Sequence, residues 1–305
     1  MAGHIFGGPD TETKLQCLNE YLTAFSTALR KQQFACIYID AFAGSGERTQ
    51  VRPALPLLGS EFSEPEEVTT PGSARLALDV DPPLNTLVLI ERDPHRYNAL
   101  IQLQAEYPER RVILKNGDAN ELVQRLCKRT PWRGPNTVGR GIRGVIFLDP
   151  YGMEVDWQTV SEIGKTEALD CWYFFPLSGL YRNAPKQAPK LSADKRRALN
   201  RLFGTEEWYN RWYNHETITT DLFGDPIATA RTADVDAIEA YVAERLSDAF
   251  RGAVLKPIRL HHKNGAPLAS LFFAISNTSP PAVKLASDIA SHILKRGSSS
   301  QVRSR

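Results

Sequence analysis

Apolar residues recur at spacings of three and four along residues 15–29. This spacing places them on one face of a helix, and Asp10 or Thr11 is suited to cap its first turn. A continuously apolar run over residues 35–39 then ends at Asp40. Such a run is typical of a strand buried on both faces of a parallel sheet. The pattern therefore predicts an amphipathic helix followed by a buried strand.

Strands and helices are expected to alternate after this point. Each of four further apolar runs comes before a stretch with helical periodicity. The expected strands are residues 86–91, 112–114, 144–149 and 169–175. The expected helix caps are Ser73, Asp93, Asn120 and Asp156. This alternation predicts a doubly wound α/β fold with a parallel sheet.

The end of the chain carries a different signal. The turn Lys263-Asn264-Gly265 joins apolar runs over residues 254–260 and 267–276, which predicts an antiparallel hairpin. Parallel strands that end in one antiparallel hairpin resemble the Rossmann-like sheet of class I methyltransferases, with seven strands, the last antiparallel. A last helix is expected over residues 282–294, and the Ser/Arg-rich residues 296–305 are expected to be a disordered tail.

Two segments interrupt the alternation. Residues 49–71 are rich in Pro, Glu and Ser and are interpreted as an inserted loop, which leaves the pose of a bound cofactor in doubt. Residues 178–232 are interpreted as an inserted helical cap for substrate or partner recognition, with helices over residues 192–203 and 206–215. The core is then expected to comprise residues 1–177 and 233–295.

Composition limits the function classes only weakly. The 305 residues include 42% hydrophobic and 24% charged residues, which is ordinary for a globular protein. A net charge of +2 neither demands nor excludes a nucleic acid partner. We expect a cytoplasmic location and no membrane association, because no signal peptide or membrane-spanning run is evident. The four cysteines are widely scattered, so buried thiols are expected and no metal site.

The clearest candidate chemistry lies where the first three predicted strands end. A glycine loop follows the first strand, and acids follow the second and third. Taken one by one, the loop could be a plain turn and the acids ordinary exposed residues. Together they lie at the strand ends where such sheets bind ligands, and an acid there can accept hydrogen bonds from ribose hydroxyls. The predicted S-adenosylmethionine-binding residues are Asp40, Ala41, Phe42, Ala43, Gly44, Gly46, Glu91, Asp118 and Ala119.

A second motif, Asp149-Pro150-Tyr151-Gly152, closes the fourth strand. It resembles the Asp/Asn-Pro-Pro-aromatic motif of amino-group methyltransferases, and its single proline is closer to the form in tRNA guanine dimethyltransferases. A carboxylate and a carbonyl that accept both hydrogens of an amine would direct its nitrogen at a methyl donor. The proline would orient its own carbonyl, and the aromatic ring would stack on a base. An ordinary strand-ending turn remains the alternative.

These motifs together resemble the three-Cys-motif partner family. The resemblance extends from the N-terminal helix to the final hairpin, and it includes Leu89-Ile-Glu91, Gly117-Asp-Ala-Asn120 and Phe272-Phe-Ala-Ile-Ser-Asn277. It implies a methyltransferase-like fold that pairs with a separate three-cysteine-motif protein. The scattered cysteines suit the partner role.

Basic and aromatic residues alternate in the predicted cap. Such a mixture suits a surface that tracks phosphates and stacks bases, although a solvated helix face over an aromatic core fits equally well. The predicted substrate-binding residues are Gly152, Pro176, Arg182, Lys186, Arg196 and Arg197, and the predicted catalytic residues are Asp149, Pro150 and Tyr151. The leading prediction is an S-adenosylmethionine-dependent methyltransferase acting on an amine nitrogen, with a nucleic acid base favoured. The alternatives are a non-catalytic or conditionally active partner subunit and, less favoured, a phosphodiester enzyme.

Overall fold

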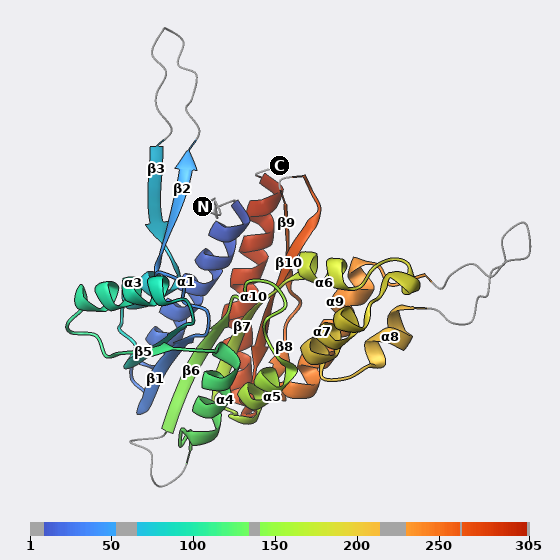
Figure 1. The fold of residues 1–305 in the computed structure, drawn as a ribbon. Helices are drawn as coiled ribbons and strands as arrows, with labels where there is room; N and C mark the ends of the chain where they lie inside the picture. Colours follow the sequence, from blue (N-terminus) through green and yellow to red (C-terminus); the bar gives the residue numbers. More distant parts are fainter. Residues whose placement is uncertain (1–8, 53–65, 134–140, 214–229, 263, 304–305) are drawn as a thin grey trace, which may run out of the picture.

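The protein is built around one mixed sheet (Figure 1). The computed structural model describes residues 9–52, 66–133, 141–213, 230–262 and 264–303. The eight-stranded sheet has the order β5-β4-β1-β6-β7-β10-β8, and β9 also pairs with β10. The parallel strands are β1 (Phe34–Asp40), β4 (Thr86–Glu91), β5 (Val112–Asn116), β6 (Gly141–Leu148) and β7 (Leu169–Phe175). Strand β10 (Pro267–Ile275) runs antiparallel to β7, β8 (Ala253–Val254) and β9 (Ile258–His261). The predicted fold class and hairpin are confirmed, except that Lys263 lies outside the described residues.

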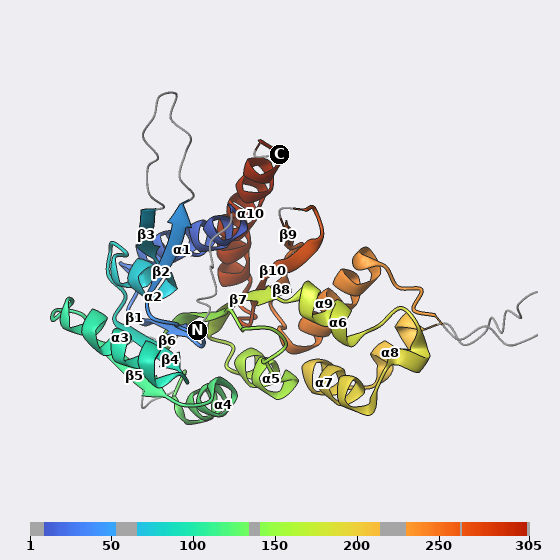
Figure 2. The ribbon, with the colours of Figure 1, turned by 45° about the horizontal axis from the view of Figure 1, so that its top comes forward.

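Both faces of the sheet are covered by helices, as the unbroken apolar strands require. Tyr38, Phe147 and Trp172 point into one core, and Ile39, Ile146 and Cys171 into the other. The helices over the first core are α1 (Pro9–Leu29), α2 (Ser73–Leu78), α3 (Pro94–Ala105) and α10 (Pro280–Arg303). Those over the second are α4 (Ala119–Arg129), α5 (Trp157–Lys165) and α9 (Val235–Ala249). The turned view in Figure 2 shows the two layers on either side of the strands.

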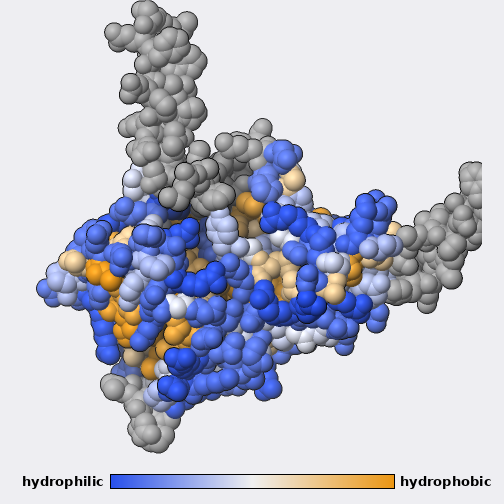
Figure 3. Space-filling model, in the orientation of Figure 1, coloured by the Kyte–Doolittle hydropathy of each residue, from blue (hydrophilic) through white to orange (hydrophobic). Residues whose placement is uncertain are grey.

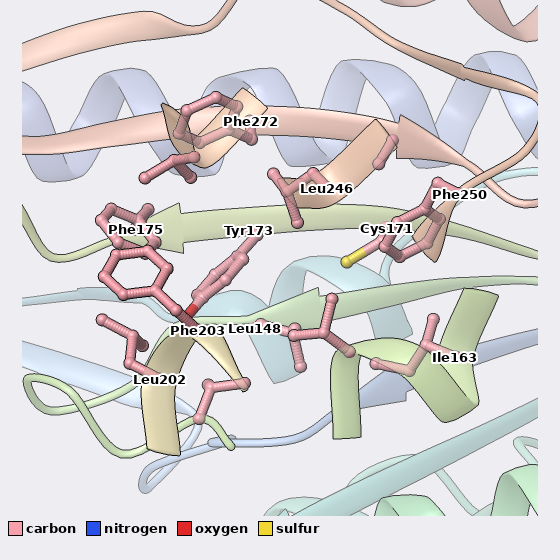
Figure 4. Close-up of a cluster of buried hydrophobic side chains, with 14 of the residues drawn as sticks. Leu148, Ile163, Cys171, Tyr173, Phe175, Leu202, Phe203, Leu246, Phe250 and Phe272 are labelled. Atoms are coloured by element: carbon pink, nitrogen blue, oxygen red, sulfur yellow. The ribbon is translucent and has the colours of Figure 1, made fainter. Parts of the chain in front are cut away.

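The predicted cap packs onto the second core. It contains α6 (Leu177–Asn183), a 3-10 turn (Ala188–Lys190), α7 (Ala193–Phe203) and α8 (Glu207–Trp212). The Phe203 ring lies between cap and core, 6.2 Å from the ring of Phe175 and 5.3 Å from that of Tyr241 (Figure 4). Trp208, Trp212 and Tyr213 are buried as well. Of the two alternatives that the sequence left open for the cap, the aromatic core holds for these three rings.

The inserted segment also differs from the prediction. Its two ends form an antiparallel hairpin, β2 (Glu47–Arg52) and β3 (Glu66–Pro71), in which Glu47 pairs with Pro71 and Arg52 with Glu66. The hairpin extends away from the sheet (Figure 1). Its sequence lacks the alternation of polar and apolar residues that marks a strand with one buried face, so the sequence alone predicts a loop here.

Four boundaries need correction. Helix α1 begins at Pro9, so Asp10 and Thr11 lie within it rather than before it. The N-cap of α2 is Gly72, not Ser73. The N-cap of α4 is Asp118, whose carboxylate accepts a hydrogen bond from Glu121 N. The predicted cap, Asn120, lies within the helix, and its side chain donates to Glu154 O instead. The final helix continues to Arg303, so the predicted disordered tail is helical up to that residue.

The surface in Figure 3 is mostly hydrophilic, with apolar side chains gathered near α3 and β5, where the sheet ends. Ile101 of α3 is 46% exposed in this region. In the described part of the chain, every helix is too short or too polar to cross a bilayer.

Helix α1 is fixed to the sheet by a buried polar contact. Tyr21 donates its hydroxyl hydrogen bond to Asp170 at the start of β7, with an oxygen–oxygen distance of 2.7 Å. Burial raises the pKa of Asp170 to about 7, against the opposing effects of the Tyr21 hydrogen bond and of Arg143. Below about pH 7 the folded protein therefore keeps a proton on Asp170. The unfolded chain releases this proton near the ordinary pKa of about 4.

This difference predicts a pH-dependent stability. Because the folded state binds more protons between pH 4 and pH 7, its free energy of unfolding should fall as pH rises through this window. The contribution is at most about 1.4 kcal/mol per pH unit. Asp170→Asn should remove it, so denaturant unfolding of the variant should vary less with pH than that of the wild type. Equal pH profiles for the two proteins would show that Asp170 is ionised in the fold; Tyr21→Phe is the matched control that keeps the carboxyl group.

Candidate active site

The predicted functional acids all lie at one edge of the sheet, where the parallel strands end. Asp40 is the last residue of β1, and the register places it beside Leu89 of β4 and Phe147 of β6. Glu91 ends β4, and Asp149 directly follows β6. This edge is where open α/β sheets bind their ligands.

Asp40 is a structural centre of the glycine loop. Its carboxyl group is fully buried and accepts hydrogen bonds from the Tyr38 hydroxyl at 3.0 Å and from Phe42 N at 3.3 Å. Burial raises its pKa to about 6, while hydrogen bonds from Ser73 and Tyr38 act in the opposite direction and the nearby Asp149 adds to the rise. Asp40 therefore holds the start of the glycine loop through its hydrogen bond from Phe42 N. Its side chain has no exposed surface for a ligand to contact.

The loop itself is held open by Glu91. One carboxylate oxygen of Glu91 accepts from Gly44 N at 3.0 Å, and the other accepts from Asp93 N at 2.7 Å. Gly44 has a φ of +64°, and a Cβ built on it would meet no atom within 4 Å. The loop thus presents open space beside a buried carboxylate, and each Glu91 oxygen keeps a second lone pair for a ligand.

The inserted hairpin leaves this arrangement intact. Gly72 N donates to Gly46 O at 2.9 Å, so the chain returns after the insertion to the residue at which it left. Helix α2 then starts at Ser73, directly beside the glycine loop. The paired strands thus bring the start of α2 beside the glycine loop despite the insertion.

Asp118 occupies the third predicted position, past β5. One of its oxygens caps α4 by accepting from Glu121 N at 3.2 Å, and the next residue, Ala119, is buried. Gly117 N donates to Glu91 O at 3.2 Å, which ties the ends of β5 and β4 together. This backbone hydrogen bond therefore keeps the two predicted cofactor-binding acids, Glu91 and Asp118, at neighbouring strand ends.

Lys14 is a site residue that sequence reasoning missed. Its ammonium group donates to both oxygens of Asp149, at 2.7 and 2.6 Å, and lies 4.2 Å from the centroid of the Phe174 ring. The exposed fractions of the two paired side chains are 11% for Lys14 and 22% for Asp149. Lys14 precedes Leu18 by four residues, so the helical period already placed this lysine on the apolar face of α1. That was the available signal.

The other residues of the Asp149 motif differ in exposure. Pro150 is buried, whereas Tyr151 is 55% exposed. Gly152 has a φ of +104°, and its Cα lies near Gly179 of α6, which also neighbours Pro176. The predicted residues Gly152 and Pro176 therefore do lie in one place.

Neighbouring elements brace the loop that follows this motif. Arg201 of α7 donates to Met153 O at 3.1 Å and pairs with Asp156, also at 3.1 Å. Asn120 donates to Glu154 O at 2.9 Å and accepts from Asp156 N at 2.9 Å. The cap and α4 thus fix the loop from two sides.

The predicted basic residues of the cap are less well placed for substrate. Arg196 forms an ion pair with Glu206 at 3.0 Å and stacks on the Tyr209 ring, and Arg197 pairs with Asp194. Arg182 and Lys186 are exposed. The structure therefore does not gather these four residues around Asp149 by any described contact, and their role in substrate binding stays a prediction.

Comparisons with known proteins add little at the level of sequence. No family model matches the chain, and no curated protein matches it. A Legionella pneumophila protein of family DUF519 is similar in structure, with 16% identity, a TM-score of 0.49, and coverage of 94% of this chain and 93% of that one. The N-terminal domain of EvdMO1 with SAH bound has 10% identity and a TM-score of 0.36, over 85% and 80% of the two chains. Aeropyrum pernix fibrillarin with natively bound S-adenosyl-L-methionine has 10% identity and a TM-score of 0.34, over 85% and 76%. Likenesses of this size say nothing about a substrate, and membership of the three-Cys-motif partner family stays a prediction.

The contact between the two ends of the insertion predicts the effect of a small substitution. A Cβ on Gly72 would lie 2.9 Å from Gly46 O, a backbone atom that cannot turn away. Gly72→Ala should therefore lower the free energy of unfolding by about 1–3 kcal/mol, measured by denaturant or thermal unfolding. Gly179→Ala is the matched control, because its Cβ would meet only ordinary contacts from 3.4 Å outward. Equal stability of the two variants would contradict the close contact.

Proposed function

We propose that this chain is an S-adenosylmethionine-dependent methyltransferase whose acceptor is an amine nitrogen, with a nucleic acid base as the favoured substrate. The observation that supports it most is the placement of Glu91 beside the open glycine loop, one strand away from β1, with Asp149 on the opposite side of β1 at the same edge. A cofactor site and an acceptor site would then lie on either side of Asp40. S-adenosylmethionine would supply a methyl group on a sulfonium, which needs no metal.

The residues present fit such a cofactor. The space beside Gly44, which any Cβ would begin to fill, gives room for a ligand to approach the backbone. Glu91 is already oriented by two backbone amides, so its remaining lone pairs would accept from ribose hydroxyls without rearrangement. Asp118 lies past the neighbouring strand, where its second oxygen would accept from an adenine amine.

Asp149 and Pro150 would bind the acceptor amine. Hydrogen bonds from an amine to the Asp149 carboxylate and the Pro150 carbonyl would hold the nitrogen in one orientation, and Asp149 would accept the proton that methylation releases. The exposed ring of Tyr151 stands next to these groups, where it would stack on a flat base. An amine bonded in this way keeps its lone pair directed away from the carboxylate.

The Lys14–Asp149 ion pair favours a second candidate, in which the chain is only conditionally active. Both carboxylate oxygens are engaged in the free chain, so an acceptor has to compete with Lys14. A three-cysteine-motif partner protein that moved the N-terminal part of α1 would relieve this competition. Under this alternative, methyl transfer would require both proteins, whereas cofactor binding would require only this chain.

The cofactor site is tested first by calorimetric titration with S-adenosylmethionine and S-adenosylhomocysteine. The wild-type chain should bind with a Kd near the micromolar range, about −8 kcal/mol. Glu91→Ala should weaken binding about tenfold or more, because the ligand hydroxyls lose their buried acceptor. Glu109→Ala removes an exposed acid and should leave binding unchanged. Full binding by Glu91→Ala would refute the assignment.

The acceptor site is tested by following labelled methyl groups into RNA and DNA. Asp149→Ala should lower the rate of transfer about 100- to 1000-fold, the range for losing one oriented group at a reacting centre. The same variant should retain cofactor binding, because Asp149 lies outside the Glu91 side of the site. If both properties fell together, Asp149 would be a structural residue.

A further inference from the structure

A cavity lies at the edge of the sheet opposite the candidate active site. Its volume is about 360 Å³, and its lining residues are Phe34, Arg133, Arg143, Asn277, Thr278 and Ser279. Phe34 begins β1 and Asp40 ends it, so about 20 Å of strand separates the cavity from the glycine loop. We propose that this cavity binds a phosphate monoester, held by Arg133 and Arg143. The site is independent of the proposed function.

The first arginine belongs to the sheet. Arg143 lies in β6, and its guanidinium carbon is 4.8 Å from the centroid of the Phe34 ring. Its Nη1 donates to Ile142 O at 3.3 Å. A ring face and a neutral carbonyl orient the guanidinium, but neither contact neutralises its charge. Arg143 is thus a cation held in place at the cavity.

The second arginine follows α4. Arg133 donates to Glu167 Oε2 at 2.8 Å and to Glu167 O at 2.7 Å. The carboxylate balances the charge of Arg133, and the carbonyl fixes its orientation. Arg133 and Arg143 together are therefore paired with one carboxylate in the described part of the chain, which leaves one positive charge to attract an anion.

A further acid, Asp170, controls how strongly Arg143 attracts an anion. Burial raises the pKa of Asp170 to about 7, although Arg143 of β6 and the hydroxyl of Tyr21 from α1 act to lower it. Cys171 is its titratable neighbour in β7, and β10 places Ile275 beside it. Below about pH 7 the protonated Asp170 leaves the charge of Arg143 uncompensated. Above this pH the ionised Asp170 competes with an external anion.

Hydroxyl groups complete the wall where β10 leads into α10. Asn277 Oδ1 accepts from Ser279 N at 2.9 Å, which fixes this turn. Thr278 and Ser279 are exposed, and their hydroxyls would donate to phosphate oxygens. Helix α10 begins at Pro280, and the positive end of its dipole adds to the attraction for an anion.

This set of groups is suited to a terminal phosphate. Planar guanidinium groups match phosphate oxygens in pairs, and the lining residues include two cations and no acid. The volume lies near the lower end of the range of small-molecule pockets, about 300–1,000 Å³, so the cavity has room for a phosphate together with a sugar. A free sugar phosphate and the 5′-phosphorylated end of a nucleic acid both carry this chemistry.

The site is tested by calorimetric titration with ribose 5-phosphate, which lacks the adenine that the proposed cofactor site would recognise. Arg143→Gln should weaken binding about tenfold or more, because a charge-assisted hydrogen bond is lost. Arg125→Gln is the matched control, because it removes an exposed arginine of α4 outside the cavity and should leave binding unchanged. Ribose without phosphate should bind far more weakly to the wild type.

Asp170→Asn provides a second variant with the opposite expected effect. At pH 8 it removes a carboxylate that is mostly ionised in the wild type, so ribose 5-phosphate should bind several-fold more tightly. A partly unfolded protein could not imitate this gain. Equal affinity of the wild type and Arg143→Gln, equal binding of ribose and ribose 5-phosphate, or weaker binding by Asp170→Asn would overturn the site.

Single-stranded RNA with and without a 5′-phosphate distinguishes the two sources of the ligand. If the 5′-phosphate strengthens binding to the wild type but not to Arg143→Gln, the cavity takes the end of a nucleic acid. If it has no effect while ribose 5-phosphate binds, the cavity takes a free sugar phosphate. Glu91→Ala should bind ribose 5-phosphate like the wild type, so failure of the cofactor site and failure of this site are separate results.

Discussion

Burial of the central sheet on both faces is the constraint on which the site depends. Side chains of β1, β6 and β7 alternate between two hydrophobic cores, so the strand bodies are mostly apolar, and Asp170 near the start of β7 is buried with Tyr21 as its partner. Only the strand ends are open, and in a parallel sheet the carboxyl ends all face the same way. Asp40, Glu91 and Asp149 are therefore neighbours although they are far apart in sequence. The fold concentrates negative charge at one edge, and that charge needs donors.

The donors come from three different levels of structure. Backbone amides of the glycine loop and of the turn after β4 satisfy Glu91. The hydroxyl of Tyr38, two residues earlier in β1, and the backbone amide of Phe42 satisfy Asp40. A lysine from α1 satisfies Asp149. The first two come from the strand ends themselves, whereas the third reaches Asp149 from α1 through a long side chain.

Much of this site could be predicted from the sequence because its signals are local. A buried strand followed at once by Asp40 and two glycines fixes both the place and the direction of the loop, and the same holds for Glu91 and Asp149. Lys14 was overlooked because its partner is 135 residues away, and a strand-end motif carries no information about which helix lies over it. The hairpin after Gly46 was overlooked because its strands pair only with each other, so no buried face marks them. In the cap, a mixture of basic and aromatic residues has the same pattern whether Trp208 and Trp212 face solvent or a core, and only the packing against α9 decides.

The joined ends of the β2–β3 hairpin have a consequence for how the protein can vary. Gly46 and Gly72 are hydrogen-bonded neighbours, so the glycine loop and α2 are effectively continuous and the segment between them is a side branch of the chain. Strand pairs that leave and return at one point can be lengthened or shortened without moving the residues at their base. The hairpin is thus a place where the inserted segment can change in length or be replaced next to the candidate site while the residues at its base keep their positions.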